Sequence, residues 1–114
     1  MTKLKLLAVG KSSKHNYYVF PKEQVFFTVA RQLLKSLGFK EYEYSAFGSL
    51  IDKKWGEPIP NKEENIKNYI DDRYSFKNKE YHVEIVFGKE KIFLMIHTEK
   101  DEQQKLARLI KKFR

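Results

Sequence analysis

Residues 81–98 read YHVEIVFGKEKIFLMIHT, and this stretch decides the fold. Apolar residues alternate with polar ones on both sides of a short polar segment, which is the pattern of two strands joined by a tight turn. Pairing Phe87 with Ile92 gives both strands one shared apolar face, whereas a shift of one residue would mix the two faces. The stretch therefore predicts an antiparallel hairpin of residues 81–87 and 92–98 in this register.

The same register sets His82 directly opposite His97. Imidazoles on opposite residues lie about 5 Å apart at their Cβ atoms, close enough to share a metal ion. A stable zinc site takes three or four protein ligands, and only Glu84, Glu99 or the distant His15 could supply the others. The alternative is that both histidines are polar residues on a half-exposed sheet face. Because no complete ligand set is present, we predict no metal site and no cofactor.

A helix is predicted over residues 22–37, upstream of the hairpin. Pro21 suits the first helical position, and Gly38 suits the position just past the end. Apolar residues recur between them at steps of three and four, so they form one buried stripe, and Phe27 is the one apolar residue off it. The stripe consists of Val25, Phe26, Val29, Ala30, Leu33, Leu34 and Leu37.

Strands are expected on both sides of this helix. Residues 3–9 alternate loosely in hydropathy, which predicts a strand that is buried on at least one face. Residues 10–16 are almost entirely polar and read as an exposed loop. Residues 39–47 alternate aromatic or small residues with polar ones, which is typical of a strand with one face exposed to solvent.

The region between this strand and the hairpin is less regular. Residues 48–60 form a loop around Trp55 that two prolines stiffen. Asn61 with a glutamate three positions later is a helix cap, and the apolar spacing that follows predicts a helix to Tyr74. Residues 75–80 then read as a polar turn.

A final helix is expected to begin near Thr98 or Asp101, and the stripe of apolar residues that it buries is Leu106, Leu109, Ile110 and Phe113. The predicted elements follow the order β-α-β-α-β-β-α. Helices packed on one mixed or antiparallel sheet of about four strands would close a single core. We therefore predict a single α+β domain over residues 1–114 with three helices.

Positive charge concentrates at the two ends of the chain, which has a net charge of +8. Residues 1–22 hold five lysines and no acid, residues 100–114 hold six bases and two acids, and residues 23–99 are nearly balanced. Nineteen of the 23 bases are lysine, a hydrated point charge that lacks the planar fork of arginine. If the two ends meet in the fold, they form one basic patch.

The composition argues against several classes of protein. The chain has no cysteine, which removes disulfides, thiolate zinc sites and cysteine nucleophiles. No apolar run approaches the roughly 18 residues of a membrane span, and the N-terminus lacks a signal-peptide pattern, so we expect a cytoplasmic protein. Residues 9–12 lack the glycine spacing of a phosphate-binding loop, and no serine sits beside an oriented histidine and carboxylate. We therefore expect a protein that is not an enzyme.

A stoichiometric binding protein is the function that remains. Our first hypothesis is a small inhibitor of antitoxin or immunity type, which covers an acidic surface of a toxin or an enzyme by complementarity and electrostatic steering. Trp55 is the candidate anchor, because rigid aromatic residues often carry much of the binding energy. The candidate basic contacts are Lys11, Lys14, Lys105, Arg108 and Lys112.

The rival hypothesis is a protein that binds DNA or RNA. Lys11 and Lys14 would then contact phosphates, and Tyr17 or Tyr18 would stack on bases. The alternative for these two tyrosines is that they pack against the edge of the first helix. The excess of lysine over arginine counts against the rival hypothesis, and so does the absence of RNA-recognition, cold-shock, zinc-finger and helix-turn-helix motifs.

Overall fold

A computed structural model describes residues 4–12, 14–23, 25–40, 51–52, 57–58, 70–100 and 102–112. Trp55 lies outside the described residues, and so do residues 41–47 of the strand predicted over residues 39–47 and most of the predicted helix that begins at Asn61. Phe39 and Lys40 are described and belong to no strand. The backbone of β3 (Ile51–Asp52) pairs with that of β4 (Glu57–Pro58) as a separate two-stranded ladder.

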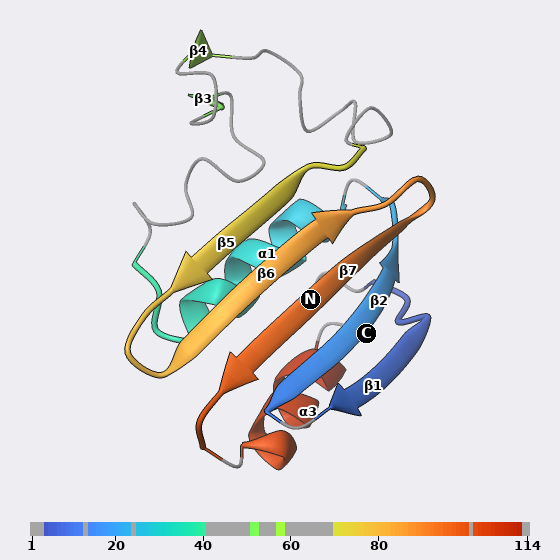
Figure 1. Ribbon diagram of the computed structural model, residues 1–114. Coiled ribbons are helices and arrows are strands. Elements are labelled where there is room, and N and C mark those ends of the chain that lie inside the picture. The colour runs from blue at the N-terminus through green and yellow to red at the C-terminus, as the bar shows by residue number, and fades with distance from the viewer. Residues whose placement is uncertain are drawn as a thin grey trace.

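The main sheet is antiparallel and has the strand order β1-β2-β7-β6-β5. Its strands are β1 (Ala8–Ser12), β2 (His15–Pro21), β5 (Arg73–Lys77), β6 (Tyr81–Phe87) and β7 (Lys91–Thr98). In Figure 1 the hairpin formed by β1 and β2 lies beside the hairpin formed by β6 and β7, although the two are far apart in the sequence. The predicted α+β class is confirmed, but the sheet has five strands where about four were expected.

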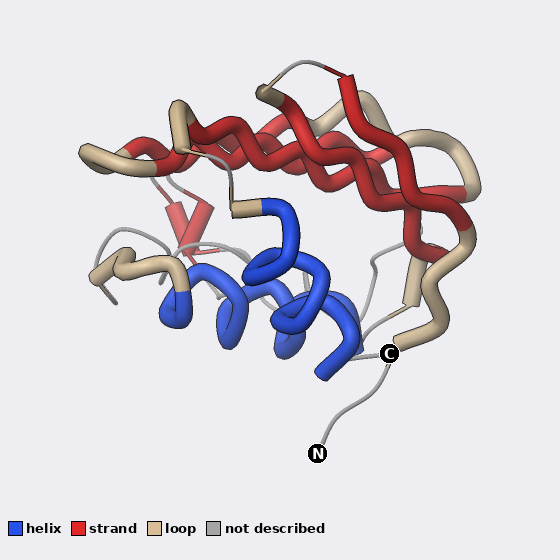
Figure 2. The backbone as a smooth tube through the Cα atoms, turned by 90° about the horizontal axis from the view of Figure 1, so that it is seen from below, coloured by secondary structure: helices blue, strands red, loops and turns tan. Residues whose placement is uncertain are grey.

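The two described helices lie on the same face of this sheet. They are α1 (Val25–Ser36) and α3 (Gln103–Lys112), and Figure 2 shows both below the single layer of strands. Three helices were expected, and the described residues contain two. Neither of the two described helices is long and apolar enough to cross a membrane.

The hairpin of β6 and β7 is confirmed in the predicted register. Phe87 lies opposite Ile92, and His82 lies opposite His97. Residues of β6 alternate strictly between buried and half-buried, because alternate side chains of a strand point to opposite faces. One of these faces packs against the helices, and the other face is open.

Helix α1 buries the predicted stripe but begins later than predicted. Pro21 does not open the helix; it ends β2 and lies opposite Lys91. Gly38 does lie just past the end of the helix, where its φ of 89° is a conformation that glycine adopts without a steric penalty. Phe27 was expected off the stripe but is 1% exposed, because its ring packs against Phe26 and Phe87.

The first hairpin corrects two predictions. The strand expected at residues 3–9 lies at Ala8–Ser12, and the loop expected at residues 10–16 consists of the end of β1, a tight turn and the start of β2. The polar composition misled the prediction because all five residues of β1 are exposed at the sheet edge. A strand in that position needs no apolar face.

Strand β5 corrects two more predictions. Tyr74 was expected at the end of a helix and Ser75 in a polar turn, but both belong to β5. Tyr74 and Phe76 face the core side of the sheet, while Arg73 and Lys77 are exposed. Two inward residues in a five-residue strand are too weak a pattern to outweigh the polar residues around them.

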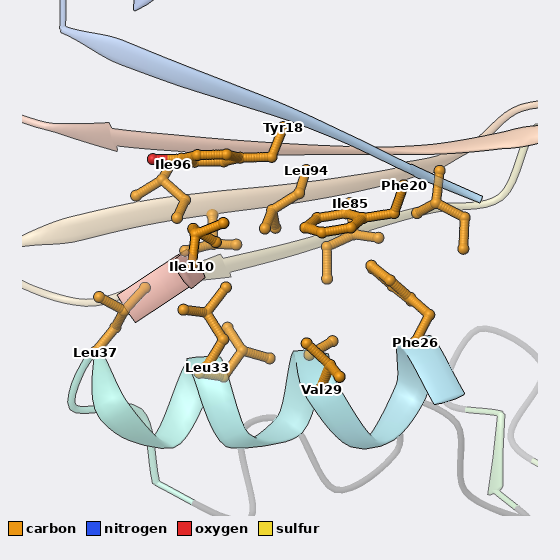
Figure 3. Packing of buried hydrophobic residues seen from close by; sticks show 14 of the residues in the cluster. Tyr18, Phe20, Phe26, Val29, Leu33, Leu37, Ile85, Leu94, Ile96 and Ile110 are labelled. Atoms are coloured by element: carbon orange, nitrogen blue, oxygen red, sulfur yellow. The ribbon is translucent and has the colours of Figure 1, made fainter. Parts of the chain in front are cut away.

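The core lies between the sheet and the two helices. Figure 3 shows Tyr18, Phe20, Ile85, Leu94 and Ile96 pointing from the strands toward residues of the helices. Phe26, Val29 and Leu33 come from α1, Leu37 follows directly after it, and Ile110 comes from α3. The predicted last helix is present, with Leu106 and Ile110 buried and Leu109 packed at the margin. It begins at Gln103 and not near Thr98 or Asp101, because Thr98 ends β7, and Phe113 of the predicted stripe lies outside the described residues.

Candidate partner-binding surface

The packing of α3 under β1 joins the two basic ends of the chain. The Lys11 Nζ of β1 donates a hydrogen bond to the Gln103 Oε1 of α3, at 2.9 Å. Further along, Val9 and Ala107 line one pocket between the two elements. The two segments therefore lie side by side, and we call the exposed side chains of β1 and α3 the β1–α3 surface.

Helix α3 supplies most of the positive charge of this surface. The helix carries four basic residues and no acidic one, and all four are exposed. Lys105, Arg108 and Lys112 follow one another at steps of three and four, so they lie on one side of the helix. Lys111 and Lys112 stand in the last turn, where positive charge also stabilises the helix dipole.

Lys105 is the basic residue of α3 that is tied into the fold. Its Nζ donates to the Tyr81 hydroxyl at 3.0 Å, and that hydroxyl donates to the Glu102 carboxylate. The hydrogen bond to Tyr81 raises the pKa of Lys105, while burial, together with the bond to Glu102, raises the pKa of Tyr81. Lys105 therefore links α3 to β6 by a hydrogen bond, and the carboxylate of Glu102 offsets part of its positive charge.

Arg108 and Lys112 are free to meet a partner. Among the described residues, neither has an acidic side chain within ion-pair distance. Both side chains are exposed, so their charges face solvent. Of the predicted contact residues on α3, these two have no acidic neighbour among the described residues.

A polar recess of about 150 Å³ lies where the β1–β2 turn meets the start of α3. Lys11 and Lys14 line it together with Asn16, Thr98 and Glu99. Lys14 pairs with Glu99, and the hydrogen bond from Lys14 is the main cause of the lowered pKa of Glu99. Among the described residues, Lys11 bonds only to the neutral Gln103 amide and has no acidic side chain within ion-pair distance, whereas the charge of Lys14 is partly neutralised by Glu99.

The predicted aromatic contacts are separated by the fold. Tyr18 is 4% exposed and points into the core, so its ring is not available to stack on a base, and burial raises the pKa of its hydroxyl. Tyr17 is half-buried on the open face of the sheet, with its ring stacked on that of His15. Helix α3 covers the opposite face, so Tyr17 and the basic residues of α3 point in different directions.

The three histidines form a row across the open face. His15 lies opposite His97, and His97 lies opposite His82. The rings of His15 and His97 are 4.5 Å apart, and His97 Nε2 lies 3.3 Å from Glu99 Oε1. His82 Nε2 lies 2.8 Å from the hydroxyl oxygen of Ser75. Within the described ranges, no three histidine or acidic side chains are grouped so that they could hold a metal ion.

Sequence reasoning missed Asn16, which lines both the polar recess and the neighbouring pocket. Asn16 is 6% exposed, and no described residue forms a hydrogen bond with its side chain. The sequence held little signal for Asn16, because its neighbours along the strand include Tyr17 and Val19, which are as apolar as the inward residues Tyr18 and Phe20. Gln103 was missed as well, and only the packing of α3 on β1 identifies it.

No protein-family model, no curated protein and no solved structure matches this chain. The function must therefore be argued from the described geometry. The observation that bears most directly on function is the β1–α3 surface, where a pocket lined by Lys11 adjoins a helix with four exposed bases.

Proposed function

We propose that this protein is a non-catalytic binding protein that forms a stoichiometric complex with an acidic protein, in the manner of a small inhibitor, antitoxin or immunity protein. The observation that carries the proposal is that β1 and α3 lie side by side, so that the exposed base Lys11 adjoins a helix whose four bases are all exposed. Complementary charge of this kind steers association and selects among partners.

Three observations favour a protein partner over a nucleic acid. Tyr18 is buried in the core, and Tyr17 lies on the sheet face that α3 does not cover. The basic residues and the stacking residues therefore do not form one continuous surface. Three of the four bases on α3 are lysines, which lack the bidentate geometry that reads base edges.

The test is affinity capture with matched charge-reversal variants. The double variant Arg108→Glu/Lys112→Glu removes the charge that we assign to binding, and Lys89→Glu/Lys91→Glu makes the same change in net charge on the exposed turn between β6 and β7. We expect the unchanged protein to capture an acidic protein in a one-to-one complex, as measured by size-exclusion chromatography with light scattering. The α3 variant should weaken that complex by about tenfold or more, and the turn variant should have little effect.

A complex that both double variants weaken equally would mean that net charge alone drives the association, and would contradict the proposal. Capture that nuclease treatment abolishes would contradict it in favour of nucleic acid. Both variants must keep the melting temperature of the unchanged protein, so that a loss of capture reports on binding.

Nucleic-acid binding is the second candidate, and the open face of the sheet favours it. Phe93 on β7 is 40% exposed, and it neighbours Tyr17 diagonally across β2 and β7. Exposed aromatic residues on a sheet are suitable platforms for unpaired bases. Fluorescence anisotropy with labelled single-stranded and duplex oligonucleotides, titrated with salt, tests this candidate. Tight binding with a steep salt dependence that Phe93→Ala weakens would support it.

A further inference from the structure

Strand β1 forms one edge of the main sheet, and all five of its residues are exposed. Alternate backbone N–H and C=O groups of an edge strand point away from the sheet, ready to pair with another strand. Natural edges are often protected by charged side chains, and the other edge strand, β5, carries Arg73 and Lys77. Strand β1 carries one charged residue, Lys11, and also presents Val9, which is 62% exposed, with Leu7 at 41% two residues before it.

A pocket of about 220 Å³ opens beside this edge, between β1 and α3. Its apolar wall includes Leu6, Val9, Tyr18 and Ile110, and Ala107 leaves room on the side of the helix. A pocket of this volume accepts one or two apolar side chains. Its position next to a free strand edge suits a chain that pairs with β1 and turns alternate side chains toward α3.

Polar groups of two kinds line the same pocket. Lys11 contributes a cation that no described acidic side chain neutralises, and Lys111 projects from α3 one turn after Ala107. Asn16 is 6% exposed, and none of the described residues forms a hydrogen bond with its amide. An incoming chain with acidic side chains would pair with the cations, and its polar groups would satisfy the Asn16 amide.

We propose that the free edge of β1 accepts an extended acidic segment of the protein partner as a sixth strand, with an apolar side chain of that segment in the pocket between β1 and α3. This inference rests on the proposed function, because it names the part of an acidic protein that binds and the way in which it binds. Main-chain hydrogen bonds supply affinity in this mode, while the pocket and the cations select the sequence.

The probe is a labelled, terminally blocked peptide of about eight residues, long enough to cover a strand, in which valine and glutamate take turns on one strand face and threonine fills the other face. The control peptide has lysine in place of glutamate. Ala107→Leu fills the pocket without changing any charge, and Gln104→Leu places the same side chain on an exposed site of α3 that does not line the pocket. Affinity is measured by fluorescence anisotropy, and amide hydrogen exchange reports on β1.

We expect the glutamate peptide to bind and the lysine peptide not to bind. Ala107→Leu should weaken binding by about tenfold or more, Gln104→Leu should leave it unchanged, and bound peptide should slow amide exchange in residues 8–12. Equal affinity for both variants would overturn the inference, and so would binding without any protection of β1. Self-association of the protein that Ala107→Leu abolishes would also overturn it, because the pocket would then belong to a second copy of the chain.

The inference and the proposed function fail in different ways. If the captured partner still depends on Arg108 and Lys112 but neither the peptide nor the partner protects β1, the strand-addition mode is wrong and the function stands. If no acidic protein is captured at all and the glutamate peptide does not bind, both are wrong.

Discussion

At the scale of single residues, Asn78 shows how one side chain can join separate parts of the fold. Its Nδ2 donates to the Leu37 carbonyl oxygen at 3.1 Å, and its Oδ1 accepts from the backbone N–H groups of Glu80 and Tyr81. The first bond reaches the end of α1, and the other two close the turn between β5 and β6. Asparagine is suited to this position because it offers both a donor and acceptor lone pairs.

We predict that Asn78→Ala lowers the free energy of unfolding by about 2 kcal/mol, because three hydrogen bonds are lost and partly buried groups lose their partners. Urea denaturation at equilibrium measures the change. Lys79→Ala, one residue further along the same exposed turn, should change the stability by less than about 0.5 kcal/mol. Equal effects of the two substitutions would show that Asn78 does not clamp the turn.

The sequence predicted the position of a single residue correctly where it also predicted the strand pairing around that residue. His82 lies opposite His97 as predicted, because the strong apolar faces of β6 and β7 allow one register. The third member of the row, His15, could not be placed, because its segment was interpreted as a loop. Tyr18 was offered for stacking, since an aromatic residue in a lysine-rich segment gives no sign of which face it will take.

At the scale of elements, α3 combines a narrow inner face with a broad basic one. Leu106 is 0% exposed and Ile110 is 4% exposed, and these two residues form the buried contact of the helix with the core. Few buried residues therefore hold the helix that carries most of the candidate contacts. The hydrogen bonds from Lys105 to Tyr81 and from Tyr81 to Glu102 also hold the first turn of α3 in place.

We predict that Leu106→Ala lowers the free energy of unfolding by about 3 kcal/mol, because it removes a fully buried side chain and leaves a cavity. Leu109→Ala, at a half-buried position on the same helix, should cost clearly less. Thermal unfolding followed by circular dichroism compares the two. A smaller loss for Leu106→Ala than for Leu109→Ala would mean that α3 packs differently from the structure described above.

Elements with a marked apolar face were predictable from the sequence, and elements at the sheet edges were not. The hairpin of β6 and β7, most of α1, and α3 each bury a regular set of residues, so the hydropathy pattern located them. The edge strands β1 and β5 bury one side chain between them, Phe76. Their conformation depends on backbone pairing with β2 and β6, and backbone pairing requires no particular side chains that a sequence pattern would reveal.

At the scale of the whole molecule, the strand order determines where charge accumulates. The sequence shows an excess of bases at each end, but it does not show whether the ends meet. They meet because β2 pairs with β7, which places β1 over α3. The balanced middle of the sequence contributes the other half of the sheet, so positive charge is uneven across the protein.

We predict that added sodium chloride stabilises this protein. Arg108 and Lys112 are four residues apart on α3, and like charges at that spacing repel by a few tenths of a kcal/mol until salt screens them. Raising the salt concentration from low to about 0.5 M should increase the free energy of unfolding in urea by roughly 0.5 kcal/mol. Arg108→Glu alone should show a smaller increase, because it replaces the repulsion between residues 108 and 112 with an attraction that salt weakens. An equal increase in both proteins would assign the salt effect to other parts of the surface.

The pairing of β2 with β7 also has a consequence for biosynthesis. Residues 15–21 are synthesised long before their partner strand, residues 91–98. Contacts between distant parts of a chain form slowly, because a long loop must close before they contribute any stability. Until β7 emerges, the first hairpin has an unpaired edge on each side and is open to incorrect pairing. Synthesis rate and chaperone supply should therefore influence the yield of folded protein more than the stability of the finished fold would suggest.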